Sequence, residues 1–298
     1  MNLISAFVRF TRPHTIIGTT LSVIGLYIIA LSNSPIMDFH VKELVLALIS
    51  CLAANIYIVG LNQITDVEID KINKPNLPLA SGVFSIRTAK IIILTSFFLA
   101  SFIAQHEGKF LFTTVSLSLL IGTLYSLPPF RLKRFHFWAA ACIFVVRGLI
   151  VNLLLFLHFN FILSGSMDIP AKIWILTGFM FGLSLVIAWF KDMPDTKGDR
   201  EFRIITLTLR LGPKKVFNIG RILLASCYIA LILIGIVGIS GVNGTILIVS
   251  HVCLLILMWI LSLKIDPANQ NSTARYYLFI WFLFYSEYIF FPLSCLIT

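Results

Sequence analysis

The sequence predicts an all-α, polytopic membrane protein with about nine transmembrane helices, and its composition, its apolar runs and the placement of its charges lead to this fold class. Of the 298 residues, 58% are hydrophobic and only 12% are charged, and the mean hydropathy is +0.96. Soluble domains have roughly 45–50% apolar and about 25% charged residues. The composition therefore excludes a water-soluble enzyme, a disordered chain and a secreted disulfide-bonded scaffold.

Nine apolar runs follow one another along the chain, and each is expected to cross a bilayer, which takes roughly 20 residues. They comprise residues 15–31, 43–61, 91–104, 110–127, 137–157, 173–190, 216–239, 245–263 and 276–296. Most contain no charge, so each is expected to satisfy its backbone hydrogen bonds as a helix in lipid. The run 91–104 is short and is expected to extend into its polar flanks, whereas the run 137–157 contains Arg147.

The cationic residues test this topology, because Lys and Arg gather on the cytoplasmic side of membrane proteins. Of the 23 Lys and Arg residues, only Lys42, Lys109 and Lys172 fall on one side, Arg147 falls inside a run, and the other 19 fall on the opposite side. The net charge of +10 is therefore explained by topology, and no nucleic-acid partner is expected. The N-terminus is expected to face the cytoplasm or its organellar equivalent.

The cysteines and the N-terminus predict neither disulfides nor a cleaved leader. The five cysteines are an odd number and lie in apolar stretches without a CxxC pair, so no disulfide framework and no zinc site are expected. Residues 1–9 lack the charged segment, short apolar core and cleavage site of a signal peptide. We expect the first apolar run to be retained in the mature protein.

A first acidic stretch follows the second apolar run, on the basic side of the membrane. Its Asn62, Asp66 and Asp70 are spaced at i, i+4 and i+8. On a continuous helix these three residues share one face and direct three oxygen ligands the same way.

A second acidic stretch follows the sixth apolar run, on the same side. Asp192, Asp195 and Asp199 share a face if this stretch is helical, although Pro194 and Gly198 weaken that expectation. Together the two stretches hold seven of the 13 acidic residues.

Oxygen ligands gathered in this way suit a hard divalent cation, and Mg²⁺ commonly shares carboxylates with substrate phosphates. Two such clusters on one side of the membrane are expected to hold a diphosphate between them through metal ions. The spacing does not match an EF-hand calcium loop. The alternative is that the carboxylates only pair with neighbouring cations on a solvated loop. Those cations are Lys71, Lys74, Lys191 and Arg200.

Arg147 indicates a functional site inside the membrane. Burying an ionisable side chain there costs free energy, so such residues are rare and usually functional. Its guanidinium could bind a diphosphate or a substrate carboxylate through two hydrogen bonds. The alternative is that the side chain extends to the membrane interface. Among the histidines, His14, near Arg12 at the basic end of the first run, is the one expected near the site.

Several segments match a known pattern. The spacings Asn62-x3-Asp66-x3-Asp70 and Asp195-x3-Asp199, in a chain with nine apolar runs, resemble the UbiA superfamily of intramembrane prenyltransferases. Residues 10–19, 55–63, 70–80 and 190–200 are similar to the homogentisate phytyltransferases of that superfamily, and the likeness continues through Arg147-Gly148 and Asn152 to Phe291-Pro292.

The resemblance implies a UbiA-like bundle in which residues 1–298 form one membrane domain, with motif loops at about 62–90 and 191–215. It implies a magnesium-dependent transfer of the phytyl group from phytyl diphosphate to homogentisate. Carbon dioxide and diphosphate leave, and 2-methyl-6-phytylbenzoquinol, a precursor of tocopherol (vitamin E), is formed. Membrane lipid is the expected surrounding of the isoprenoid tail.

The resemblance also implies roles for individual residues. Catalytic roles fall to Asp66, Asp70, Asp195, Asp199 and Arg147. Two magnesium ions would be held by Asn62, Asp66, Asp70, Asp195 and Asp199, with Asp192 an addition to the superfamily's second motif. The diphosphate would contact Lys71, Arg131, Lys133 and Lys191. From position alone, and not from the resemblance, the acceptor is expected to contact Arg12, His14, Tyr125 and Asn152, with Arg147, Arg12 or His14 receiving its carboxylate and Tyr125 or Asn152 its hydroxyls.

The expected location is the thylakoid or plasma membrane of a bacterial-type phototroph, or a plastid membrane if a transit peptide has been removed, with the site toward the cytoplasm or stroma. A sister enzyme remains open, with a geranylgeranyl or solanesyl donor or with another aromatic acceptor such as a chlorophyllide. An ion-coupled transporter is the alternative from a different class, but it predicts acidic residues near the bilayer midplane, whereas these lie at helix ends.

Overall fold

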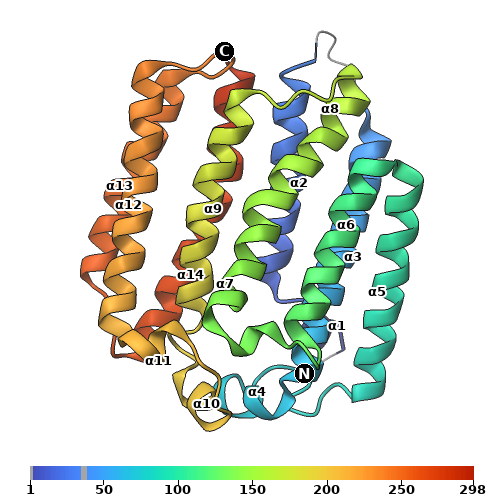
Figure 1. The fold of residues 1–298 in the computed structure, drawn as a ribbon, viewed down its shortest axis with the longest axis vertical. Helices are drawn as coiled ribbons and strands as arrows, with labels where there is room; N and C mark the ends of the chain where they lie inside the picture. The colour runs from blue at the N-terminus through green and yellow to red at the C-terminus, as the bar shows by residue number, and fades with distance from the viewer. Residues whose placement is uncertain (1–2, 35–38) are drawn as a thin grey trace.

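The computed structural model of the chain describes residues 3–34 and 39–298, which form a bundle of helices (Figure 1). The helices are α1 (Leu3–Phe10), α2 (Pro13–Leu31), α3 (Val41–Thr65), α4 (Val67–Asn73), α5 (Ile86–Glu107), α6 (Lys109–Ser126), η1 (Leu132–Arg134), α7 (His136–Phe144), η2 (Val145–Leu155), α8 (Phe156–Ser164), α9 (Ala171–Lys191), α10 (Thr196–Glu201), α11 (Leu207–Leu211), α12 (Pro213–Val237), α13 (Gly244–Leu263) and α14 (Gln270–Leu296). The predicted all-α fold class is confirmed.

Nine helical segments of the described chain are long and apolar enough to cross a membrane, as the sequence predicts. The fifth span is a continuous helix made of α7, η2 and α8, and the other eight are α2, α3, α5, α6, α9, α12, α13 and α14. The short third run does extend into its flanks, because α5 begins at Ile86 and ends at Glu107. Ser85 starts this helix by accepting a hydrogen bond from the Thr88 amide at 3.0 Å.

Helices α9 and α14 are the most deeply buried spans, whereas α5 and α13 are the most exposed. The approach of α2 to α14 depends on glycine: a Cβ atom at Gly18 would lie 2.8 Å from the Trp281 ring, and one at Gly25 would lie 2.9 Å from the Tyr288 carbonyl oxygen. Such small residues let membrane helices pack closely, since lipid supplies no hydrophobic drive for their association. This packing fixes Trp281 and Tyr288 relative to α2.

The fifth span departs from a regular α-helix, because η2 is π-helical over Val145–Leu155. Short π-helical stretches inside α-helices often occur at functional sites. Gly148 lets η2 pack against α9, where an added Cβ atom would lie 2.8 Å from the Cα atom of Phe181. The hydropathy pattern predicts the span but not its π-helical segment, because the same apolar residues would suit an α-helix or a π-helix.

The short helices α4, α10 and α11 gather at one end of the bundle, near the start of the described chain, while the C-terminus lies at the opposite end (Figure 1). The segment between α6 and α7 and the segment between α10 and α11 meet at this end through backbone hydrogen bonds. The His136 amide donates to the Ile205 carbonyl at 3.0 Å, and the Ile205 amide donates to the Arg134 carbonyl at 3.1 Å. We call this the motif end, because it carries both acidic stretches.

The single helix expected through the first acidic stretch is interrupted. Helix α3 ends at Thr65 and α4 begins at Val67, so Asp66 lies at a break with φ −118°. The Asp70 amide still donates to the Asp66 carbonyl at 2.7 Å. The three ligand candidates of this stretch therefore do not share one face of a continuous helix, which corrects the expectation from their spacing.

The second acidic stretch is also only partly helical. Helix α9 ends at Lys191 and α10 begins at Thr196, so Asp192 and Asp195 lie in the intervening turn and Asp199 lies on α10. Pro194 is in the turn, where its missing backbone N–H does not interrupt a helix.

Candidate active site

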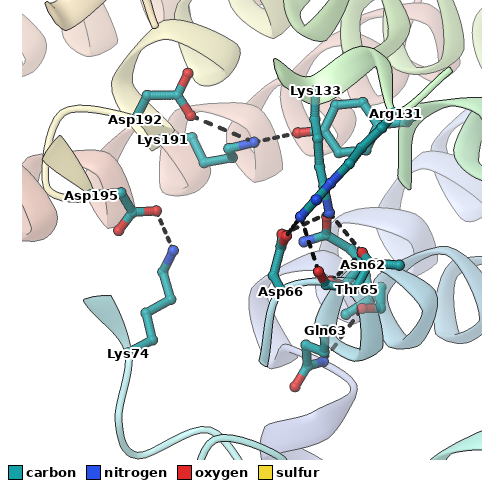
Figure 2. Close-up of polar contacts among 12 residues, drawn as sticks. Asn62, Gln63, Thr65, Asp66, Lys74, Arg131, Lys133, Lys191, Asp192 and Asp195 are labelled. Carbon is teal, nitrogen blue, oxygen red and sulfur yellow. Dashed lines mark hydrogen bonds and ion pairs between the residues drawn. The ribbon is translucent and has the colours of Figure 1, made fainter. Parts of the chain in front are cut away.

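Two cations from the connection between α6 and α7 neutralise Asp66 (Figure 2). Lys133 Nζ lies 2.8 Å from the Asp66 carboxylate and donates to Asn62 Oδ1 at 3.0 Å. Arg131 donates to Asp66 Oδ1 and to the Thr65 carbonyl oxygen, both at 3.1 Å. Burial lowers the pKa of Lys133 to about 8, against the opposing effect of the Asp66 charge. The structure thus brings Asn62, Asp66, Arg131 and Lys133 together.

The two acidic stretches contact each other directly. Lys74, just after α4, forms an ion pair with Asp195 of the second stretch (Figure 2). Beside it, the Gly198 amide donates to Asn73 Oδ1 at 2.9 Å, and a Cβ atom at Gly198 would lie 2.7 Å from that side chain. Any larger residue at Gly198 would have to displace the Asn73 side chain, which bonds α10 to the end of α4. Both motifs form one surface at the motif end.

Two further carboxylates are buried there without a partner. Asp70 and Asp199 are 5% and 6% exposed, and neither side chain makes a hydrogen bond or an ion pair with another described residue. Burial raises the pKa of Asp70 to about 6. Burial, together with the negative charges of Asp192 and Asp195, raises the pKa of Asp199 to about 8. Burial also raises the pKa of Asp192.

These residues fit a divalent cation of the magnesium type. The six candidates offer only oxygen donors, which hard cations prefer. Asp70 and Asp199 are buried carboxylates with no direct ion pair among the described residues, and their pKa values stay raised although Lys74 lies near both, so a bound cation would compensate their charge. Within residues 3–34 and 39–298, no three His, Cys, Asp or Glu side chains already converge on one point. The ammonium group of Lys133 lies beside Asp66 instead, and that of Lys74 lies beside Asp195.

The alternative is that the carboxylates only pair with neighbouring cations on a solvated loop. The ion pairs are present, but the carboxylates are not well solvated. Lys74 and Lys191 do pair with neighbouring carboxylates, the latter with Asp192 at 3.6 Å. The Asp66 and Asp195 side chains are only 14% and 10% exposed, so this surface is not a solvated loop.

A cavity opens from the motif end into the bundle, between α2, α3, α6, the fifth span and α14. It extends from Asn62 to Cys51 along α3 and from Tyr125 to Thr114 along α6. Each distance is roughly 16 Å at the rise of an α-helix. Wall hydroxyls such as Ser22 and Thr114 donate to carbonyls of their own helices. The cavity therefore has a charged mouth and a largely apolar interior.

Arg147 lies in the cavity wall. Its guanidinium carbon is 4.8 Å from the Trp281 ring centroid and 5.9 Å from that of Phe284. Apart from these cation–π contacts, the guanidinium makes no hydrogen bond or ion pair with another described residue. Its N–H donors are thus available to an anionic group in the cavity.

The mouth of the cavity carries four more of the expected side chains. Lys191 Nζ lies 2.6 Å from the Tyr125 hydroxyl, and both residues line the cavity. The His14 ring packs against Trp281 with a centroid distance of 5.1 Å. Arg12 lines the cavity and also a shallow adjoining pocket that contains Lys74.

Two expected contacts are not supported by the structure. Lys71 pairs with Glu68 at 2.8 Å on the exposed side of α4 and lines neither pocket, so Lys74 is the inward-facing lysine of this segment. Asn152 is fully buried and absent from the cavity wall. Its NH₂ group donates to backbone carbonyls of η2 and its Oδ1 accepts from the Tyr288 hydroxyl, so no free group remains for an acceptor hydroxyl.

The aromatic contacts of Arg147 are not predicted by the sequence. Trp281 and Phe284 hold Arg147, and they lie three residues apart on α14. Their spacing is a possible signal, but 26 Phe and five Trp residues occur in the chain, and most helical spacings of this kind reflect packing or lipid contact.

Comparison with known proteins decides the family. Residues 17–283 match the UbiA prenyltransferase family. The chain belongs to this family. This UbiA prenyltransferase is 47% identical to a homogentisate phytyltransferase of Synechocystis sp., over 99% of this chain and 96% of the relative. It is 37% identical to a homogentisate geranylgeranyltransferase of Triticum aestivum, over 96% of this chain and 72% of the relative.

Solved structures agree with the fold. A UbiA homologue from Archaeoglobus fulgidus, bound to GPP and Mg²⁺, matches with a TM-score of 0.71 and 17% identity, covering 98% of this chain and 100% of that one. The UbiA bundle expected from the sequence is therefore confirmed.

The two lysines of the first motif loop give a direct test within this UbiA prenyltransferase. We expect Lys74→Met to lower prenyl-transfer turnover about tenfold or more, because it leaves the part-buried Asp195 carboxylate without its cation. Lys71→Met is the matched control and should change turnover less than about twofold, since its ion pair is exposed. Initial rates in membranes would measure both, and equal losses would contradict the assignment of Lys74.

Proposed function

We propose that this UbiA prenyltransferase transfers the phytyl group of phytyl diphosphate to homogentisate. The observation that carries the proposal is 47% identity to a homogentisate phytyltransferase along nearly the whole of both chains, compared with 37% for a geranylgeranyl-transferring relative. The site supports it chemically: Arg12 and Lys191 at the mouth, a largely apolar wall and Arg147 in that wall line one cavity.

The motif end would bind the diphosphate of the donor. Asn62, Asp66, Asp70, Asp195 and Asp199 would hold two magnesium ions, with Asp192 beside them. When bound, the ions supply positive charge that stabilises the departing diphosphate. Mg²⁺ accompanies GPP in the Archaeoglobus fulgidus homologue, which supports the choice of metal.

Cationic side chains would assist at the same place. Lys133 and Arg131 already lie beside Asp66, and Lys191 lies at the cavity mouth. Their N–H groups can bind diphosphate oxygens once those oxygens are present. Lys74 would complete this set in place of Lys71.

The apolar interior would accommodate the isoprenoid tail. The cavity reaches roughly 16 Å below its mouth along two helices, and its deep wall includes Val23, Cys51 and Leu155. Such a surface excludes water from the reacting carbon. Exclusion of water favours attack by the acceptor ring over hydrolysis of the donor.

Arg147 would bind the carboxylate of homogentisate, with Arg12 and His14 beside it and Tyr125 toward the ring hydroxyls. The C–O bond to diphosphate breaks and a C–C bond to the ring forms. The ring proton is released. The carboxylate leaves as carbon dioxide, and a proton taken up at the side-chain carbon balances the loss. An acceptor held by Arg147 would lie between the apolar wall and the diphosphate site. Its ring must be there to attack the donor carbon from which the diphosphate departs.

The proposed setting is a single membrane domain spanning residues 1–298 whose motif end faces the cytoplasm or stroma. The concentration of Lys and Arg on that side supports this orientation. A thylakoid or plasma membrane of a phototroph, or a plastid membrane, is the setting proposed from the relatives. A transporter is disfavoured, since the clustered acids lie at helix ends and not at the midplane.

A donor panel tests the proposal. Membranes containing the full chain would be supplied with labelled homogentisate, magnesium and phytyl, geranylgeranyl or solanesyl diphosphate. We expect a phytylated, decarboxylated quinol as the main product, with rates roughly tenfold or more below this for the other donors. A chelator should abolish the product, and excess magnesium should restore it.

Each contrary outcome has a separate meaning. Preference for another donor would show that the enzyme transfers a geranylgeranyl or solanesyl group and not a phytyl group. Lack of any product with homogentisate, but prenylation of a different aromatic acceptor, would contradict the acceptor. Full activity in chelator would contradict the proposed metal.

A further inference from the structure

The turn that carries Arg147 is tied to α14 by two buried side chains. We propose that Asn152 and Tyr288 are positioning residues that set the place of the Arg147 guanidinium and thereby the affinity for the acceptor's carboxylate. This inference rests on the proposed function, because it takes Arg147 as the group that binds that carboxylate.

Asn152 acts on the backbone of the turn. Its Nδ2 donates to the Arg147 carbonyl oxygen at 2.9 Å and to the Gly148 carbonyl oxygen at 3.0 Å. A π-helix has wider turns than an α-helix and is rarely stable over a long stretch. Side-chain hydrogen bonds to its carbonyls therefore favour this backbone over the regular one. The carbonyl groups concerned belong to Arg147 and its neighbour, so the effect falls where the guanidinium is anchored.

Tyr288 orients the amide of Asn152. Its hydroxyl donates to Asn152 Oδ1 at 2.8 Å, and the two residues are 2% and 0% exposed. An amide whose oxygen accepts this bond must direct its NH₂ group the other way, toward the η2 carbonyls. Loss of the hydroxyl would leave a buried acceptor unsatisfied and would remove the preference for this orientation.

One face of α14 therefore fixes both the guanidinium and the backbone of Arg147. Trp281, Phe284 and Tyr288 are spaced at i, i+3 and i+7, which places them on one side of the helix. The first two contact the guanidinium, and the third holds the backbone through Asn152. The approach of α2 at Gly25, close to the Tyr288 carbonyl, keeps this part of α14 in place.

The test is equilibrium binding of labelled homogentisate to the purified full chain in detergent, without donor or metal, followed by steady-state kinetics. Tyr288→Phe should raise the homogentisate dissociation constant and KM roughly tenfold, and leave the KM for phytyl diphosphate within about twofold. Asn152→Leu should have at least the same effect. The double variant should resemble Asn152→Leu, since both residues act through one chain of hydrogen bonds.

Tyr276→Phe is the matched control. Tyr276 is also a buried tyrosine of α14, and its hydroxyl donates to the Met258 carbonyl at 3.3 Å, away from the cavity. The control removes a buried hydroxyl from the same helix, so it should lower stability as much without changing either KM. If Asn152→Leu fails to fold, Tyr288→Phe decides alone.

The outcomes separate the two proposals. Unchanged homogentisate binding in Tyr288→Phe, or an equal rise in the KM of both substrates, overturns the positioning role while the unaltered chain still binds and phytylates homogentisate. If the unaltered chain neither binds nor phytylates homogentisate, the proposed function itself fails, and the positioning role fails with it.

Discussion

Replacing Asp66 with asparagine is expected to lower prenyl-transfer turnover by roughly a thousandfold, because it removes a carboxylate that would hold magnesium at the place where the diphosphate departs. The asparagine keeps the size of the side chain and one oxygen. It no longer neutralises Lys133 and Arg131, which contact Asp66 at 2.8 and 3.1 Å. Initial rates of quinol formation, at matched amounts of folded protein from size-exclusion chromatography in detergent, would measure the loss.

Glu68→Gln provides the control for Asp66→Asn. Glu68 lies two residues further along and pairs with Lys71 on the exposed side of α4. Because exposed ion pairs contribute little, its replacement should change turnover less than about twofold. Near-normal activity of Asp66→Asn under saturating magnesium would contradict a metal-binding role for Asp66.

Arg147→Met is expected to raise the KM for homogentisate about a hundredfold, with a much smaller change in the KM for phytyl diphosphate. Methionine fills a similar space against Trp281 and Phe284 but cannot donate hydrogen bonds to a carboxylate. Arg147→Lys should recover only part of the loss, because a lysine cannot bind a carboxylate through two parallel bonds. Steady-state kinetics with each substrate varied in turn would separate the two constants.

Arg221→Met is the matched control for Arg147→Met. Arg221 lies on α12 with its guanidinium carbon 5.1 Å from the Trp259 ring centroid, and it does not line the cavity. Its replacement removes a comparable cation–π contact from the membrane region. Similar KM values for homogentisate in the two variants would contradict a specific role for Arg147.

The sequence predicts the spans well because crossing a bilayer imposes a local rule on each run. A run must be long and apolar whatever surrounds it, so the pattern needs no knowledge of neighbours. The acidic stretches stand out for the same reason, since charge is scarce elsewhere in the chain. The residues of both stretches do meet at the motif end.

The remaining features depend on tertiary contacts. The choice between Lys71 and Lys74 depends on which side of α4 meets α10, and the break at Asp66 sets that direction. Asn152 resembles a polar residue available to a substrate until Tyr288, 136 positions later in the chain, is placed against it. Neither relation is encoded in the spacing of nearby residues.

The charged mouth and apolar interior of the cavity suit two substrates that dissolve in different phases. A donor with an isoprenoid tail is dissolved in the membrane, so the quantity that governs its encounter with the site is its surface density among lipids. The acceptor is small and anionic, so its concentration in the adjoining aqueous compartment governs its arrival. The reaction therefore couples a two-dimensional pool to a three-dimensional one, and the amount of membrane becomes a determinant of flux in its own right.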